Sequence, residues 1–222
     1  MGLFITLDGL DASGKETQSK LLTEALRNKG YRVRELSFPM YGQKSAVPVE
    51  LYLGGTLGDK PEDTNAFAAS SFFSVDRYIS YRTDWKKDID DPDTIVVSNR
   101  YTTANAVHQL SKLPRDKWDD FLSWLWDFEF DRLGLSRPDV ILYLEMHPDI
   151  ARRLLAHRTA ETGRKQDIHE KSVSHLENSY RAALYASDTL GWNRICCHRE
   201  GEPRPLSDIH RDIMAVVAPH LP

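Results

Sequence analysis

The segment that most constrains the fold is residues 3–30, where an apolar run, a glycine-containing turn and a helical pattern follow one another. The run "LFITLD" at 3–8 is short and rich in strand-forming residues. Apolar residues then recur at helical spacing within 16–29, and Gly30 predicts where that helix ends. Because "YRVRELSF" at 31–38 is typical of another strand, we expect a β-loop-α-β unit that begins a parallel sheet.

The rest of the chain repeats this alternation of strands and helices. Three more apolar runs follow turn signals and predict strands at 94–99, 139–146 and 192–198. Helical spacing occurs at about 65–83, 117–133, 148–158, 170–187 and 206–218. In 222 residues this pattern predicts one α/β domain spanning 1–222, with five parallel strands flanked by helices. The polar stretch 157–171, here called the lid segment, is expected to be a loop or flap.

Composition excludes several classes of partner. The net charge of −4 gives no general attraction to nucleic acid, so an anionic ligand would need a local basic pocket. No apolar run is long enough to cross a membrane, and we expect a cytoplasmic protein without a signal peptide. The adjacent Cys196 and Cys197 favour neither a mutual disulfide nor a metal site. The apolar face within 118–128 predicts core, or core plus a dimer interface.

The turn after the first strand carries the clearest chemistry. In "FITLDGLDASGKETQ", Gly9, four residues, Gly14 and Lys15 fit the frame of a phosphate-binding loop. Glycines let backbone N–H groups turn toward an oxyanion, the helix presents its N-terminus, and the lysine adds a positive charge. The predicted phosphate-contacting residues are Gly9, Leu10, Asp11, Ala12, Ser13, Gly14, Lys15, Glu16 and Thr17.

Glu16 stands where such loops usually carry a Ser or Thr that binds Mg²⁺. Mg²⁺ prefers hard oxygen ligands and keeps several waters, so the Glu16 carboxylate or the adjacent Thr17 hydroxyl are candidate ligands. The alternative is that Glu16 is simply a favourable residue for the first helical turn. The sequence leaves these two interpretations open.

From Asp11 to Gln18 the loop, "DASGKETQ", resembles the thymidylate kinase form of the motif, and further blocks extend the resemblance over essentially the whole chain. It implies a P-loop NTPase-type fold with a mobile lid, and transfer of the ATP γ-phosphoryl to dTMP. It also implies Mg²⁺ as a cofactor and a homodimer. Asp11 matches the family carboxylate that accepts a hydrogen bond from the sugar 3′-hydroxyl.

The resemblance assigns acceptor-binding residues in two blocks. "FPMYG" resembles the family's Phe-Pro segment and places Phe38 and Tyr41 at the acceptor. Many members carry an acceptor-gripping Arg where this chain has Tyr41, and Lys44 is a candidate replacement. In "FFSVDRY", Phe73 and Arg77 match the aromatic residue and the Arg that hold the thymine ring, a pair that shares one helix face. An amphipathic helix with a core Phe and a surface Arg is the alternative.

A third block, "SNRYTTANAVHQ", matches the strand end that clamps the acceptor phosphate. The resemblance makes Arg100 that clamp, although Asn99 replaces the usual Asp. Asn105 matches the amide that reads the pyrimidine edge, since an amide offers both a donor and an acceptor. His108 falls beside the sugar in the family pattern, or is a satisfied polar helix residue.

The lid segment matches the family's lid, and it contains Arg158, Arg164 and Lys165. Some family members carry a catalytic Arg in the loop and others in the lid. Because no Arg lies between Gly9 and Lys15, this chain resembles the lid type, with Arg158 and Arg164 as catalytic candidates beside Lys15, Arg100 and Asp11.

Two other functions stay open at this stage. The departures at Tyr41 and Asn99 are compatible with a kinase for another pyrimidine nucleotide or nucleoside. Glu16 and Asn99 are also compatible with a nucleotide-binding regulator that transfers no phosphate.

Overall fold

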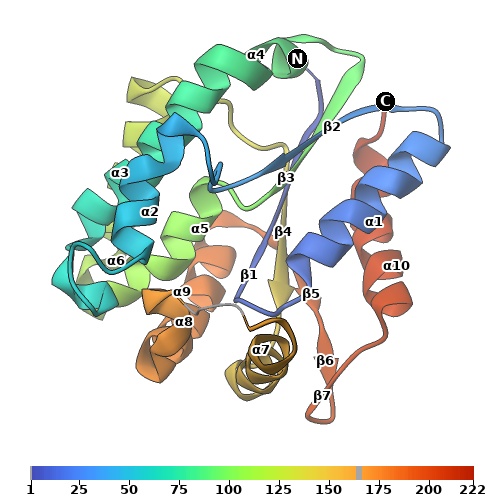
Figure 1. Ribbon diagram of the computed structural model, residues 1–222. Helices are drawn as coiled ribbons and strands as arrows, with labels where there is room; N and C mark the ends of the chain where they lie inside the picture. Colours follow the sequence, from blue (N-terminus) through green and yellow to red (C-terminus); the bar gives the residue numbers. More distant parts are fainter. Residues whose placement is uncertain (1, 164–166) are drawn as a thin grey trace.

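The computed structural model describes residues 2–163 and 167–222, and its centre is a five-stranded parallel sheet in the order β2-β3-β1-β4-β5 (Figure 1). The inner strands are buried along nearly their whole length, whereas the edge strands β2 and β5 expose several residues, as expected for a parallel sheet covered on both faces. The expected parallel sheet of five strands is confirmed. The strands are β1 (Phe4–Gly9), β2 (Arg32–Ser37), β3 (Thr94–Asn99), β4 (Val140–Glu145) and β5 (Asn193–Cys196).

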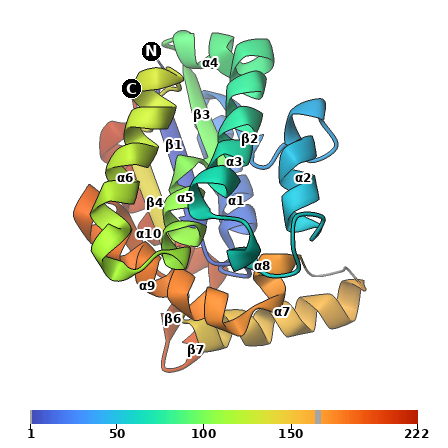
Figure 2. The same cartoon turned by 90° about the vertical axis from the view of Figure 1, so that its left-hand side faces the viewer.

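Helices cover both faces of this sheet and so bury its apolar residues. The helices α1 (Lys15–Asn28) and α10 (Leu206–Val217) lie on one face (Figure 1), and they share a buried cluster with Ile5 and Leu7 of β1. The other face is covered by α3 (Ala66–Ser80), α5 (Thr102–His108), α6 (Trp118–Trp126) and α9 (Val173–Leu190) (Figure 2). The apolar face of α6 packs mostly inside this layer.

The remaining elements show where sequence patterns were incomplete. The helix expected at 65–83 continues from α3 through a π-helical turn, Tyr81–Trp85, into α4 (Lys86–Asp90). A two-stranded hairpin of β6 (His198–Arg199) and β7 (Glu202–Pro203) was not predicted, because strands of two residues carry no periodicity. The short α2 (Val47–Leu53) lies beside α3. Among the described residues no helix has the length and apolar character of a membrane span.

The lid segment is more helical than predicted. The expectation of a loop is wrong for residues 157–162, because α7 (Pro148–Thr162) extends through them and ends at Gly163 in the left-handed conformation. The described chain resumes at Asp167 and forms α8 (Ile168–Lys171), whose start carries a capping box between Asp167 and Glu170. Polar composition therefore misled the prediction, since a solvent-facing helix needs few apolar residues.

Gly9 ends β1 where the backbone leaves no room for a side chain. A Cβ at this position would lie 2.5 Å from the Ser13 Oγ and 2.7 Å from the Leu144 carbonyl oxygen. We expect Gly9→Ala to lower the free energy of unfolding by about 1–3 kcal/mol, measured by urea denaturation, because the loop must shift to accept it.

Ala12 provides the matched control in the same loop. Its φ of 63° is in the left-handed region, where glycine is at ease. Ala12→Gly should therefore leave the free energy of unfolding within about 1 kcal/mol of wild type. Equal stability losses in both variants would contradict this account of the loop.

Candidate active site

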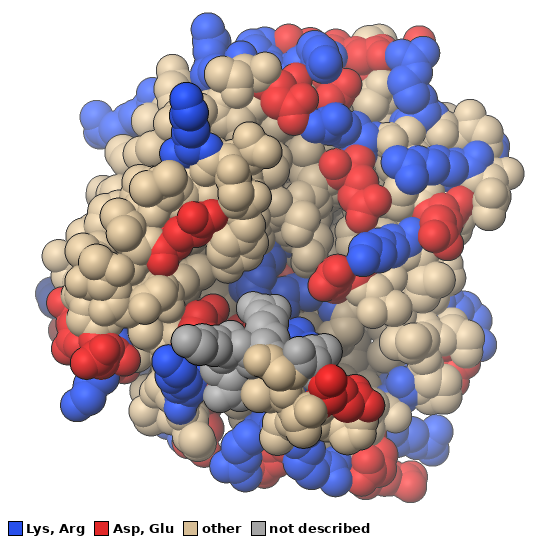
Figure 3. Space-filling model, viewed as in Figure 1, with Lys and Arg blue, Asp and Glu red and all other residues tan. Residues whose placement is uncertain are grey.

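A cavity of about 600 Å³ opens at the carboxyl ends of β1 and β3, where ligands commonly bind in open α/β sheets. Figure 3 shows this face of the molecule, with Lys and Arg side chains in the hollow near its centre. Most of the predicted site residues line the cavity: Asp11, Ala12, Gly14, Lys15, Glu16, Thr17, Phe38, Tyr41, Phe73, Arg77, Arg100, Asn105, His108 and Arg158. Volume and lining suit a nucleotide-sized ligand.

The loop after β1 has the geometry of an anion site. Gly14 adopts the left-handed conformation, with φ of 86°, and α1 begins directly after it. The Lys15 ammonium folds back over the loop and donates to the Leu10 carbonyl oxygen at 3.1 Å. A helix N-terminus and a buried ammonium therefore meet at one wall of the cavity, which favours negatively charged groups there.

The Asp11 carboxylate connects this loop to Arg100, which directly follows β3. Asp11 accepts hydrogen bonds from Lys15, at 3.3 Å, and from the Arg100 guanidinium. Burial opposes ionisation of Asp11, but Arg100 and Lys15 outweigh it and hold the pKa of this carboxyl well below its usual range. Burial, followed by the charge of Arg100, lowers the pKa of Lys15 to about 8, while Asp11 acts in the opposite direction.

Arg100 is held in place by its own backbone. Its N–H donates to the Leu7 carbonyl oxygen at 2.8 Å, and its φ of 67° places a non-glycine residue in the left-handed region. Such backbone strain persists only where surrounding contacts fix it, and it is common at functional sites. The guanidinium also donates to the His108 Nε2 at 3.0 Å, so this side chain is aimed into the cavity beside the loop.

The far end of the cavity is organised by a buried carboxylate that the sequence patterns did not reveal. Glu129 is fully buried and accepts a hydrogen bond from the Arg77 Nε at 2.7 Å, and a second from the same guanidinium. It also accepts from the Thr102 hydroxyl at 2.6 Å and from the Asn105 amide at 3.3 Å. Arg77 and Asn105 line the cavity with fixed orientations, and Phe73 lies on the same helix as Arg77.

The cavity also offers hard oxygens of the kind that Mg²⁺ prefers. The Asn99 side-chain oxygen has no hydrogen-bond partner among the described residues, while its amide nitrogen donates to Ser37 at 3.1 Å. Thr17 and Glu16 line the same cavity, although the Glu16 carboxylate contacts Lys20 at 2.8 Å. The donor set therefore fits a magnesium ion held by Asn99 and Thr17 or Glu16.

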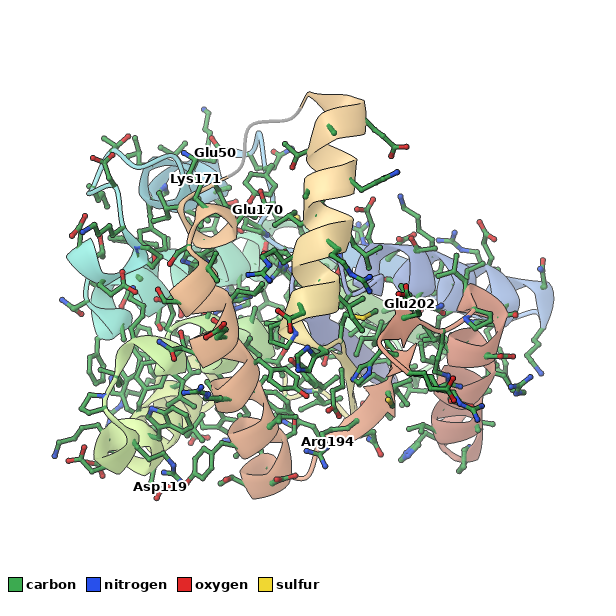
Figure 4. The ribbon with its side chains drawn as sticks, turned by 90° about the horizontal axis from the view of Figure 1, so that it is seen from below. Glu50, Asp119, Glu170, Lys171, Arg194 and Glu202 are labelled. Atoms are coloured by element: carbon green, nitrogen blue, oxygen red, sulfur yellow. The ribbon has the colours of Figure 1, made fainter. Side chains whose placement is uncertain are left out.

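Described residues of the lid segment line part of the cavity, and Figure 4 shows α7 beside Glu170 of α8. Arg158 of α7 donates to the Glu170 carboxylate of α8 at 2.8 Å, and both residues line the cavity. Burial, together with the nearby Asp11, raises the pKa of Asp167 to about 6. The predicted Arg164 and Lys165 lie outside the described residues.

Some predicted residues lie apart from the cavity wall. Within the loop, three residues are buried and do not line the cavity: Gly9, Leu10 and Ser13. Lys44 is exposed and lies outside the cavity. Asp8 was missed, although its carboxylate accepts from the Gly9 N–H at 2.8 Å and from the Thr103 hydroxyl at 2.7 Å, and so braces the loop. A charged residue in the apolar run "LFITLD" was the available signal.

Two other omissions also left signals in the sequence. Glu129 is an acid within the apolar run "WLWDFEF", where an unpaired charge would be costly. Asp167 and Glu170 have the spacing of a capping box, which marks the start of a helix within the lid segment.

Comparisons with known proteins agree with this geometry. A family profile described as Thymidylate kinase matches residues 7–195. The chain is 28% identical over 193 residues to the thymidylate kinase of Mycobacterium tuberculosis, covering 86% of this chain and 87% of that protein. It is 29% identical over 214 residues to the thymidylate kinase of Homo sapiens, covering 96% and 88%. A solved structure of a thymidylate kinase from Candida albicans shares the fold, with a TM-score of 0.70, 15% identity, and coverage of 99% and 92%.

The Glu129–Arg77 pair gives a prediction about stability. Glu129→Ala leaves a buried guanidinium without its carboxylate, and we expect the free energy of unfolding to fall by about 3–5 kcal/mol in chemical denaturation.

The matched control replaces both charges. Glu129→Leu combined with Arg77→Met removes the unpaired charge and should recover most of the lost stability. If the double variant were less stable than Glu129→Ala, the ion pair would not be the cause.

Proposed function

The chain belongs to the thymidylate kinase family and transfers the γ-phosphoryl group of ATP to the 5′-phosphate of dTMP, giving dTDP, and we propose that this transfer takes place in the cavity between Lys15 and Arg100. The observation that carries the assignment is the Asp11 carboxylate, which contacts both cations. Lys15 and Arg100, the proposed donor-side and acceptor-side charges, both contact this carboxylate, which supports a meeting of two phosphates at this wall.

On the donor side, the loop and α1 would hold the ATP phosphates. The start of α1 and Lys15 line the cavity, so the helix N-terminus and the ammonium would attract a polyphosphate. Magnesium, when bound through Asn99 and Thr17 or Glu16, would spread the charge of the phosphate oxygens. The lid residue Arg158 is positioned to approach the transferred group, and Arg164 is proposed for the same role.

On the acceptor side, Arg100 would orient the dTMP phosphate. A phosphate monoester has a second pKa near 6 and is largely dianionic at neutral pH, so the reaction needs positioning and charge neutralisation more than a strong base. Phe73, Arg77 and Asn105 would hold the thymine ring, with Phe38 and Tyr41 beside it. Asp11 would also accept from the 3′-hydroxyl, and His108 would lie near the sugar.

We also propose a homodimer in the cytoplasm. Phe67, Val75 and Ile79 of α3 are 41–42% exposed, which leaves an apolar surface that a second copy can cover. The Trp-rich face of α6, for which the sequence predicted core or core plus a dimer interface, is largely covered within the chain, so the exposed face of α3 is the candidate interface. Cys196 and Cys197 are both free thiols, which suits a reducing compartment.

The roles of Lys15 and Arg158 are tested by their alanine variants. Lys15→Ala should abolish measurable turnover while thermal unfolding stays cooperative, because the helix keeps its glycine cap. Arg158→Ala should lower kcat at least about tenfold with little change in the KM for dTMP, because the lid Arg acts on the transferred phosphate. A coupled assay of ADP release measures both.

Arg152→Ala is the matched control for Arg158→Ala, since Arg152 lies on the same helix and pairs with Asp149 at the surface. It should retain wild-type kinetics. If Arg158→Ala kept the wild-type kcat, Arg158 would have no catalytic role.

A further inference from the structure

Three buried histidines from three different helices meet beside the cavity. His108 ends α5, His169 lies in α8 at the end of the lid segment, and His175 lies in the first turn of α9. The ring centroids of His169 and His175 are 4.4 Å apart, and His108 stacks at 5.3 Å from His169 and 5.7 Å from His175. One ring nitrogen of each lies within 4.8 Å of those of the other two.

The hydrogen bonds around this cluster are incomplete. The His108 Nδ1 and the His175 Nε2 have no partner among the described residues, although these residues are only 6% and 2% exposed. Buried polar atoms are nearly always paired, and two orphaned nitrogens on neighbouring, stacked imidazole rings point to a ligand that both rings would bind. His169 keeps a contact at 2.8 Å between its Nε2 and the Tyr52 hydroxyl.

Burial favours the neutral form of all three rings. Burial lowers the pKa of each histidine, assisted by neighbouring positive groups, and that of His175 falls to about 4. Neutral imidazole is the ligating form, and it suits zinc-class transition metals rather than Mg²⁺, which prefers oxygen.

The positive groups around the cluster have partners of their own. Lys112 donates to the Tyr52 hydroxyl at 3.1 Å and to the Gln109 side-chain oxygen at 2.8 Å. Arg100 and Lys15 lie on the cavity side, where ionised Asp11 offsets them.

We propose that His108, His169 and His175 form a binding site for a zinc-class divalent metal ion, separate from the magnesium that accompanies the nucleotide. Three imidazoles leave a coordination position open, as in zinc sites that keep an exchangeable ligand. Because His108 and His169 line the cavity, that position faces the substrates. The metal would also tie α8, and with it the end of the lid segment, to α5 and α9.

This site is coupled to Arg100, whichever nitrogen of His108 binds the metal. If Nε2 binds it, the Arg100 N–H loses its acceptor directly. If Nδ1 binds it, the ring proton moves to Nε2, which then faces the Arg100 N–H as a second donor. Zinc and the Arg100–His108 hydrogen bond therefore exclude each other. The expected weakening of dTMP binding rests on the proposed role of Arg100.

Metal binding is tested on the full chain without nucleotide, after treatment with a chelator. Co²⁺, whose visible bands report its coordination, replaces zinc as the probe. We expect one equivalent to bind with the bands of a four- or five-coordinate nitrogen site and to be displaced by Zn²⁺. His175→Ala should weaken Co²⁺ binding at least about tenfold. His157→Ala is the control, because His157 is an exposed histidine outside the cluster.

His169→Gln provides an independent variant should His175→Ala fail to fold, as judged by circular dichroism. Wild-type Co²⁺ affinity in a folded variant of either kind, or no stoichiometric binding by the wild-type chain, would overturn the site.

A kinetic measurement separates the site from its coupling to the acceptor. Zn²⁺ should raise the KM for dTMP in the wild-type protein and not in His175→Ala. Stoichiometric metal binding with an unchanged KM would overturn the coupling through Arg100 and leave the histidine site in place.

Discussion

The contact on which the active site depends is that of the Asp11 carboxylate with Lys15 and Arg100. Burial and mutual repulsion would otherwise drive these two cations apart or discharge the lysine, whose pKa is already lowered to about 8. Asp11 keeps both charges at one wall of the cavity while the cavity contains no substrate. Phosphate groups of the two nucleotides supply the same negative charge when they bind, so the free site is balanced for the ligands it receives.

The two ends of the cavity are organised differently, which matches the different roles that we propose for them. At the end proposed to bind the base, Glu129 holds Arg77 and Asn105 through buried hydrogen bonds, so the orientation of both side chains is fixed before a ligand arrives. At the end proposed to bind phosphate, the charged groups come from separate strand ends and from the lid. Phosphoryl transfer depends mainly on positioning and on charge stabilisation, and charged groups suit that role.

The sequence was most informative where one local pattern carries both structure and chemistry. Gly9, Gly14 and Lys15 predicted the loop, and the alternation of strands and helices predicted the sheet, because both depend on near neighbours in the chain. The sequence marked Glu129 as an acid in an apolar run, but its partners on α3 and α5 could not be predicted, because they meet it only through packing. The same holds for the histidine cluster, in which His108 of α5 meets His169 and His175 from far along the chain. The lid was judged from polarity, which does not distinguish a loop from an exposed helix such as α7.

The most direct measurement follows labelled γ-phosphate from ATP with dTMP, dUMP, UMP, CMP or thymidine as acceptor. A cavity that reads a thymine ring and clamps a 5′-phosphate predicts one labelled dTDP for each ADP released, with dTMP the preferred acceptor and thymidine inactive. Release of ADP without labelled dTDP, or equal transfer to thymidine, would contradict it.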